Sequence, residues 1–144
     1  MTRLAGINDI SILSTLLMEY REFYGVISQN QEEIKNFLLK RIKNDESKIF
    51  ITFEGDTAVG FIQLYPSFST VSLKHQWNLN DLYVKKDYRR KGYATELMTT
   101  AKKYFKDKSK GFTLITQKNN STAKAFYTAD GWTTDEYDFY TFFF

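Results

Sequence analysis

The sequence contains no cysteine and only one histidine, His75, among its 144 residues. Disulfide bonds, thiolate metal ligands and a covalent cysteine intermediate are therefore excluded. A single histidine also gives no basis for a His-based zinc site or for a Ser-His-Asp triad, so we expect no metal. Any acyl transfer on this chain would have to be direct.

Long apolar runs and a strong charge of one sign are also missing. No run approaches the ~20 residues of a membrane span, and residues 1–6 lack a signal-peptide segment, which predicts a cytoplasmic protein without a membrane partner. The 20 basic and 17 acidic side chains give a net charge of +3, too balanced for a general nucleic-acid binder. With 42% hydrophobic residues, the chain is expected to form one domain, residues 1–144.

Apolar periodicity predicts an edge strand at residues 2–5 and two helices before the main part of a sheet. Spacings of three and four favour helices between Asp9 and Gly25 and over residues 29–44. From Lys48 the period changes to two. The following hairpin turns at residues 55–56, and its return strand is predicted to end at Pro66, the only proline.

The apolar pattern of the next strand changes phase near residues 80–81. Trp77 and Leu79 share one face, whereas Leu82 and Val84 share the opposite face. Such a slip predicts a β-bulge, which would leave backbone N–H and C=O groups free for an extended ligand. A strand buried on both faces, which needs no bulge, is the alternative.

A basic turn follows this strand and leads into an amphipathic helix. Residues 85–91 read KKDYRRK, and apolar residues then recur at helical spacing up to residue 105. A helix N-terminus offers unpaired N–H groups and the positive end of a dipole. With Gly92 and the guanidinium groups of Arg89 and Arg90 beside it, this turn is expected to bind a phosphate. A solvated basic loop is the ordinary alternative.

Residues 112–116 are predicted to form a short buried strand parallel to the one that ends at Val84. Asn120 then begins a helix that Gly131 ends. The aromatic tail, residues 132–144, is interpreted as two short strands or one bent strand.

The basic turn carries the spacing Arg89-x-x-Gly92-x-Ala94. It resembles the acetyl-CoA motif, Q/R-x-x-G-x-G/A, of the GCN5-related N-acetyltransferase (GNAT) family, in which this loop holds the CoA pyrophosphate. The later run Asn120-x-x-Ala123-x-x-x-Tyr127-x-x-x-Gly131-Trp132 resembles the second GNAT signature, N-x-x-A-x-x-x-Y-x-x-x-G-F/W.

The two motifs stand in the order of the family, and with the preceding helices and hairpin the resemblance covers nearly the whole chain. It implies a single-domain α/β GNAT fold. The mixed twisted sheet would have about six or seven strands and four flanking helices, and a splayed parallel strand pair would bind CoA.

The resemblance implies an N-acetyltransferase that moves the acetyl group of acetyl-CoA directly to a primary amine of a small molecule or peptide in a ternary complex. Tyr127 would be the general acid, unless it only packs in the core. Asp81 is the first candidate for the base or for binding the cationic acceptor. Glu54, His75 and water are the alternatives. An N–H group of Tyr83 or Val84 would polarise the thioester carbonyl.

The remaining predictions concern the CoA arm, the acceptor and assembly, for which a homodimer is one option. Asn120 would orient the CoA arm or simply cap its helix. A CoA-binding module without turnover is the main competing function, and a nucleic-acid binder that uses the cations of residues 85–110 ranks last. The acceptor is expected to contact Tyr24, Trp77 and Asp81, with Tyr20 and Phe68 as further candidates. For the aromatic residues, a place in the core is the equal alternative. The residues expected to bind acetyl-CoA are Leu82, Tyr83, Val84, Arg89, Arg90, Lys91, Gly92, Tyr93, Ala94, Thr95 and Asn120.

Overall fold

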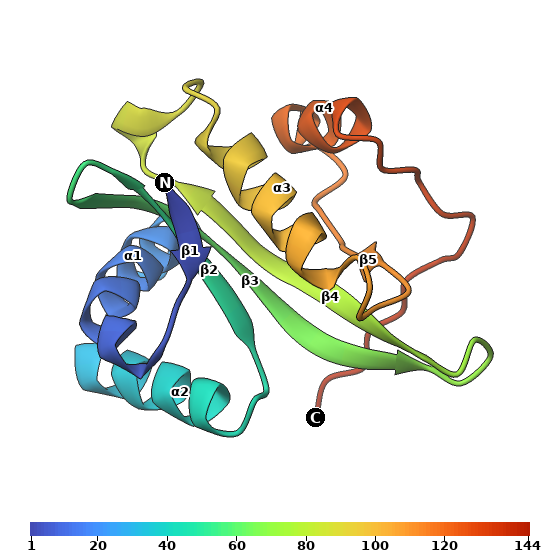
Figure 1. Cartoon of the computed structure of the whole chain (residues 1–144), viewed down its shortest axis with the longest axis horizontal. Helices are drawn as coiled ribbons and strands as arrows, with labels where there is room; N and C mark the ends of the chain where they lie inside the picture. Colours follow the sequence, from blue (N-terminus) through green and yellow to red (C-terminus); the bar gives the residue numbers. More distant parts are fainter. The chain divides into compact units, whose positions relative to one another are not determined.

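A five-stranded sheet runs through the first of two compact units, which comprise residues 1–114 and 115–144 (Figure 1). The computed structural model describes all residues, 1–144. The strands lie in the order β1-β2-β3-β4-β5; neighbouring strands from β1 to β4 are antiparallel, and β5 is parallel to β4. Their bounds are β1 Thr2–Leu4, β2 Lys48–Glu54, β3 Thr57–Ser69, β4 Lys74–Val84 and β5 Phe112–Thr113.

Three helices belong to the first unit and one to the second, and none has the length and apolarity needed to cross a bilayer. Local sequence explains their ends. For example, the Asn30 side chain accepts a hydrogen bond from the backbone N–H of Glu33 (3.2 Å), which caps the second helix. The helices are α1 Ile10–Phe23, α2 Gln31–Lys43, α3 Tyr93–Phe105 and α4 Ser121–Ala129; two short 3₁₀ helices span Ile7–Asp9 and Lys86–Tyr88.

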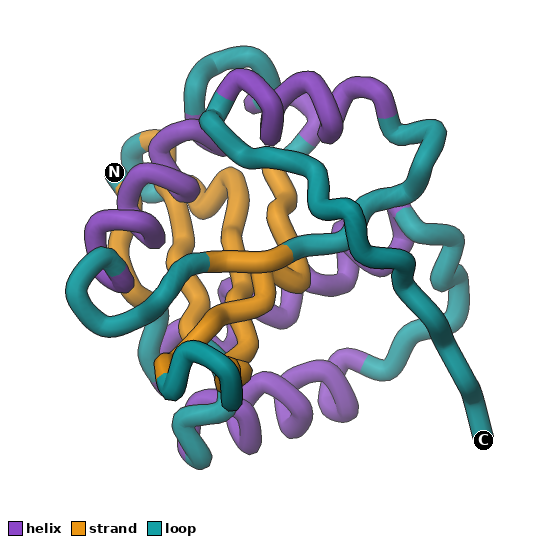
Figure 2. Tube along the Cα trace, turned by 90° about the vertical axis from the view of Figure 1, so that its right-hand side faces the viewer, coloured by secondary structure: helices purple, strands orange, loops and turns teal.

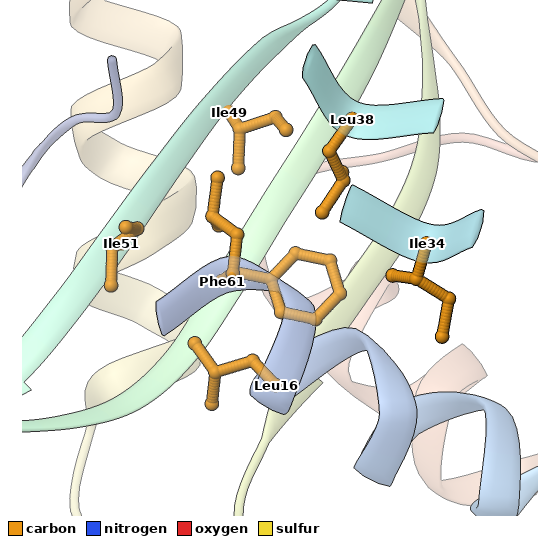
Figure 3. Close-up of a cluster of buried hydrophobic side chains, with 7 residues drawn as sticks. Leu16, Ile34, Leu38, Ile49, Ile51 and Phe61 are labelled. Atoms are coloured by element: carbon orange, nitrogen blue, oxygen red, sulfur yellow. The ribbon is translucent and has the colours of Figure 1, made fainter. Parts of the chain in front are cut away.

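The strands of the first unit run between helices (Figure 2). On one face, α1 and α2 bury a cluster in which Leu16, Ile34, Leu38, Ile49, Ile51 and Phe61 converge (Figure 3). On the other face, Phe50 and Trp77 contact the Phe105 ring of α3. Because side chains alternate along a strand, each position on β2 to β4 is committed to one of these two layers.

The structure corrects the predicted number of strands. The sheet has five strands rather than six or seven, and β5 covers only Phe112–Thr113 rather than residues 112–116. The tail, residues 132–144, contains no strand. Apart from the half-buried Trp132, its aromatic side chains are exposed, and because they alternate poorly the tail offers no single face to bury. The structure divides into two compact units, and a single domain over residues 1–144 stays a prediction.

Pro66 lies inside β3 rather than at its end, which corrects a second prediction. It stands opposite Trp77 in the β3–β4 pair, and the N–H of Trp77 points away from β3, to the carbonyl of Gly111 (3.0 Å). This pair therefore lacks mutual hydrogen bonds. On the other side, β2 begins at Lys48, opposite Leu64, so the missing donor of Pro66 faces no strand.

Candidate active site

One edge of β4 is left without a partner strand. The pairing of β4 with β5 comprises only Trp77 with Phe112 and Asn78 with Thr113. On its other side, β4 stays paired with β3 as far as Val84. We call the unpaired side of Leu79–Val84 the open edge. It supports the predicted splay of a parallel strand pair.

Near the end of β4, Leu82 and Val84 direct their backbone groups to the open edge. The N–H of Lys85 donates to the carbonyl of Val59 (2.8 Å), which shows that residues 83 and 85 direct their N–H and C=O groups toward β3. Because these directions alternate along a strand, Leu82 and Val84 direct theirs to the open edge. Of the two predicted N–H groups for the thioester carbonyl, that of Val84 is therefore available and that of Tyr83 is used within the sheet.

The predicted bulge is confirmed. Gln63 pairs with Asp81 and Leu64 with Leu79, so Asn80 is the extra residue of β4. Before the bulge, Trp77 directs its N–H toward β5. After it, Leu82 and Val84 direct theirs to the same side. The bulge thus changes which residues present backbone groups along this side of the strand.

The basic turn continues from β4 into α3. Arg90 and Gly92 adopt left-handed conformations, with φ of 61° and 89°, and no side chain caps the helix at Gly92. The first backbone N–H with an acceptor inside the helix is that of Glu96, which bonds to the carbonyl of Gly92 (3.0 Å). The N–H groups of Tyr93, Ala94 and Thr95 precede it and can receive an anion.

The cations of this turn have different surroundings. Arg89 directs its Nε to the carbonyl of Val84 (2.9 Å), and its guanidinium lies over the ring of Phe23 (5.5 Å). Arg89 therefore fixes the turn to the end of β4. Lys91 lies 3.6 Å from a carboxylate oxygen of Glu54. Arg90 takes part in none of the ion pairs and is exposed.

Two of the candidate bases, Glu54 and His75, lie away from the end of β4. Glu54 accepts a hydrogen bond from the hydroxyl of Tyr93 (2.7 Å), and this bond raises the pKa of Tyr93 to about 12. His75 is exposed on β4, where its ring contacts that of Phe68 (4.9 Å between centroids). Neither residue lies in the stretch of β4 after the bulge.

Asp81, by contrast, lies at the bulge and is only 6% exposed. Its Oδ2 accepts a hydrogen bond from Nε2 of Gln63 (2.7 Å), and its Oδ1 accepts one from Nδ2 of Asn80 (3.1 Å). Gln63 in turn accepts a hydrogen bond from the hydroxyl of Ser47 (2.8 Å). Ser47, Gln63, Asn80 and Asp81 form what we call the Asp81 cluster.

Tyrosines from two elements surround the Asp81 cluster. Burial, followed by the charge of Asp81, raises the pKa of the Tyr20 hydroxyl on α1. The same two causes raise the pKa of Tyr65 on β3 to about 12. The ring of Tyr24 lies against that of Tyr20 (5.0 Å between centroids) and is half exposed. The phenols of Tyr20 and Tyr65 therefore stay protonated at neutral pH.

The predicted acceptor residues do not all lie together. Asp81 lies two positions before Tyr83, on the face of the sheet that α1 covers, and Tyr24 reaches it through Tyr20. Trp77 is buried on the opposite face against Phe105 (4.5 Å between centroids). Its burial gives Trp77 a role in the core, and we leave it out of the acceptor site.

The second unit carries the other two predicted residues. The side-chain oxygen of Asn120 accepts a hydrogen bond from the N–H of Ala123 (3.2 Å) and caps α4, as the sequence predicts. The ring of Tyr127 lies against those of Phe126 and Trp132, each 5.6 Å away between centroids. The catalytic role of Tyr127 stays a prediction.

Sequence reasoning did not find Gln63 or Ser47. The available signal was Gln63 itself, a polar side chain in the middle of the apolar run AVGFIQLY. Its partners follow from the strand register, which no local pattern gives.

Comparison with known proteins identifies the family that this geometry suggests. The model of the acetyltransferase (GNAT) family matches residues 12–132. The chain belongs to the GNAT family of acetyltransferases. The match begins inside α1 and ends at Trp132, so it includes the open edge, the basic turn and α4.

Curated relatives agree with membership of the GNAT family. The chain is 39% identical over 134 residues to an uncharacterized N-acetyltransferase, YhfO, of Bacillus subtilis, with 92% of this chain and 89% of the relative covered. It is 31% identical over 117 residues to a probable acetyltransferase of Haemophilus influenzae, with 81% and 74% covered.

Solved acetyltransferase structures have the same fold. A crystal structure of a probable acetyltransferase superposes with a TM-score of 0.93 at 34% identity, covering 100% of this chain and 97% of that one. A predicted acetyltransferase with acetyl-CoA from Clostridium acetobutylicum has a TM-score of 0.77 at 17% identity, with 98% and 95% covered, and shows similarity of fold alone.

Proposed function

We propose that this chain is an N-acetyltransferase that transfers the acetyl group of acetyl-CoA directly to a primary amine of a small molecule or peptide. The observation that carries the proposal is the open edge of β4 followed, without interruption, by the basic turn and the uncapped start of α3. Membership of the GNAT family and a solved structure of the same fold with acetyl-CoA support it.

The open edge and the basic turn suit two different parts of acetyl-CoA. The pantetheine arm has two amides, which can pair with the outward N–H and C=O groups of Leu82 as an added strand would. The pyrophosphate carries negative charge and suits the N–H groups of residues 93–95 and the nearby Arg90. The N–H of Val84 would then polarise the thioester carbonyl.

The reaction can be written with every proton placed. The acceptor ammonium first gives one proton to a base, for which we propose Asp81. The neutral nitrogen attacks the thioester carbon, the carbon–sulfur bond breaks, and the thiolate takes a proton from Tyr127. The nitrogen of the new amide loses its second proton, which restores Tyr127 through solvent. One proton is released overall.

The roles of Asp81 and Tyr127 rest on different observations. Asp81 is buried at the bulge, two residues before Tyr83 and next to the open edge. Tyr127 stands at the tyrosine of the second GNAT motif, and the hydroxyl of a tyrosine can donate a proton to a thiolate. The exchange with solvent is the simplest way to reprotonate it.

Two measurements on the purified chain test the proposed function. Calorimetry should detect acetyl-CoA binding in the wild type and none in Gly92→Glu, since a carboxylate would meet the anion at a position where a β-carbon touches nothing within 4 Å. Gly92→Ala is the matched control for the change of backbone preference. Equal binding by Gly92→Glu would contradict the assigned anion site.

The second measurement separates an enzyme from a CoA-binding module. CoA release is followed with acetyl-CoA and a panel of aliphatic amines, amino acids and short peptides. Release above the rate without amine supports the transferase. Binding of acetyl-CoA without release for any amine would favour the module.

A further inference from the structure

Gln63 and Ser47 are polar residues buried inside the first unit, and the reaction as proposed gives them no role. Gln63 is 1% exposed and Ser47 is 4% exposed. Burying an amide or a hydroxyl is unfavourable unless it is hydrogen-bonded. Both groups are hydrogen-bonded, and these bonds connect Ser47 through Gln63 to the carboxylate of Asp81.

The Gln63 amide joins Ser47 to Asp81. Its Oε1 accepts the hydroxyl hydrogen of Ser47 (2.8 Å), and its Nε2 donates to Asp81 (2.7 Å). Asn80 gives a second N–H to the other oxygen of Asp81 (3.1 Å). An ionised carboxylate only accepts hydrogen bonds, whereas a protonated one must also donate. The surroundings of Asp81 therefore match its ionised form.

No basic side chain neutralises Asp81. It takes part in none of the ion pairs of the structure. The titratable groups that face it are the hydroxyls of Tyr20 on α1 and Tyr65 on β3, while Arg41 of α2 acts on Tyr65. The phenols of Tyr20 and Tyr65 are neutral. A carboxylate held by amide donors, with no cation beside it, can pair with a cationic ligand such as an ammonium.

We propose that Gln63 and Ser47 are positioning residues that hold Asp81 as an ionised proton acceptor for the ammonium of an aliphatic amine. The proposal rests on the proposed transferase function. Gln63 fixes one carboxylate oxygen, and Ser47 fixes the amide of Gln63. In the reaction, the ammonium nitrogen loses one proton to Asp81, which becomes a neutral carboxylic acid, and no other bond changes in this step.

The first test needs no acceptor. The carboxyl carbon of Asp81 is followed by ¹³C NMR over pH in the free protein labelled at aspartate, and Asp81→Asn assigns its signal. In Gln63→Met, the pH at the middle of the signal change should rise by about one to two units relative to the wild type. This follows from the loss of a hydrogen bond to a charged group, about 1.5–3 kcal/mol, at 1.36 kcal/mol per unit.

Two further variants make this result specific. Ser47→Ala removes only one buried hydroxyl and so disturbs the fold less than Gln63→Met. In this variant, the midpoint of the Asp81 titration should move in the same direction by a smaller amount. Gln31→Met is the matched control, because Nε2 of Gln31 donates to the hydroxyl of Ser14 (3.2 Å) without a carboxylate beyond it. The Asp81 midpoint should not move in that variant.

The second test uses turnover with an aliphatic amine found in the panel and with an aromatic amine that is neutral at the assay pH. Gln63→Met should lower kcat/KM for the aliphatic amine most at low pH, and should change the aromatic amine little, because that amine needs no base before attack. Unchanged midpoints in both Gln63→Met and Ser47→Ala would overturn the proposal, even if both variants are less stable. If no amine releases CoA, the transferase function fails, while the NMR titration still decides the role of Gln63.

Discussion

Gly60 allows β3 and β4 to come close together beside the open edge. A β-carbon at this position would lie 2.5 Å from the backbone carbonyl oxygen of Tyr83, 3.2 Å from Cγ2 of Val84 and 3.3 Å from its Cα. The nearest atom belongs to the backbone, so it cannot rotate away. In Gly60→Ala, β4 must therefore move by about 0.5 Å to reach an acceptable contact.

The expected loss of stability follows from two opposing effects. Overpacking costs about 1–3 kcal/mol, and replacing glycine by alanine recovers about 0.5–1 kcal/mol by restricting the unfolded chain. With the middle of each range, the net loss is about 1 kcal/mol, which corresponds to a decrease in Tm of about 2–4 °C for a protein of this size. Because the N–H of Val84 moves with the strand, kcat should also fall by about tenfold.

Urea denaturation and CoA release measure the two effects. Gly6→Ala is the matched control, since a β-carbon there would touch nothing within 4 Å and Gly6 has an extended conformation with φ of −128°. This control should differ from the wild type by less than about 0.5 kcal/mol. If Gly60→Ala were as stable and as active as Gly6→Ala, the close contact of β3 with β4 at Tyr83 would be refuted.

Three further predictions concern other parts of the chain. Tyr127→Phe should bind acetyl-CoA as the wild type does but lower kcat by about 10²-fold or more, and wild-type turnover at all pH values would remove Tyr127 as the acid. Arg89→Met should weaken acetyl-CoA binding measured by calorimetry by about 1–2 kcal/mol, because the carbonyl of Val84 loses its donor; an unchanged Kd would show that Arg89 does not shape the turn. The hydrogen bonds from Arg3 lower the pKa of Asp9 in the folded protein. The ionised carboxylate therefore stabilises the fold at pH values above the pKa of Asp9 in the unfolded chain, near ~4. This stabilisation is lost as the pH falls through the lower pKa of the folded state. Asp9→Asn should therefore cost about 1 kcal/mol at pH ~7 and nothing in strong acid; a difference that does not depend on pH would contradict this assignment.

Features that are defined by residues close together in the sequence could be predicted from the sequence alone. The phase change between Leu79 and Leu82 revealed the bulge because the apolar residues on the two sides of Asn80 face opposite layers. The order of Arg89, Gly92 and Ala94 located the start of α3, and Asn120 located the start of α4. In each case the residues that define the feature are neighbours in the chain.

Features that depend on strand register could not be predicted in this way. Pro66 was expected to end β3. It lies inside the strand because β2 begins opposite Leu64, so no strand faces the position where Pro66 lacks an N–H. The hydrogen bond from the N–H of Lys85 to the carbonyl of Val59 shows that Val84, and not Tyr83, directs its N–H to the open edge. Gln63 and Asp81 are 18 residues apart, and they meet because their strands pair opposite each other.

The open edge also bears on how the protein behaves in concentrated solution. Unpaired backbone donors and acceptors along a strand can recruit a strand from another molecule, and natural proteins usually cover or interrupt such edges. Arg89 blocks one carbonyl at its end, but the groups of Leu82 remain. A ligand lying there would act as a removable cover, so saturating acetyl-CoA should slow aggregation on storage as well as supply the acetyl group.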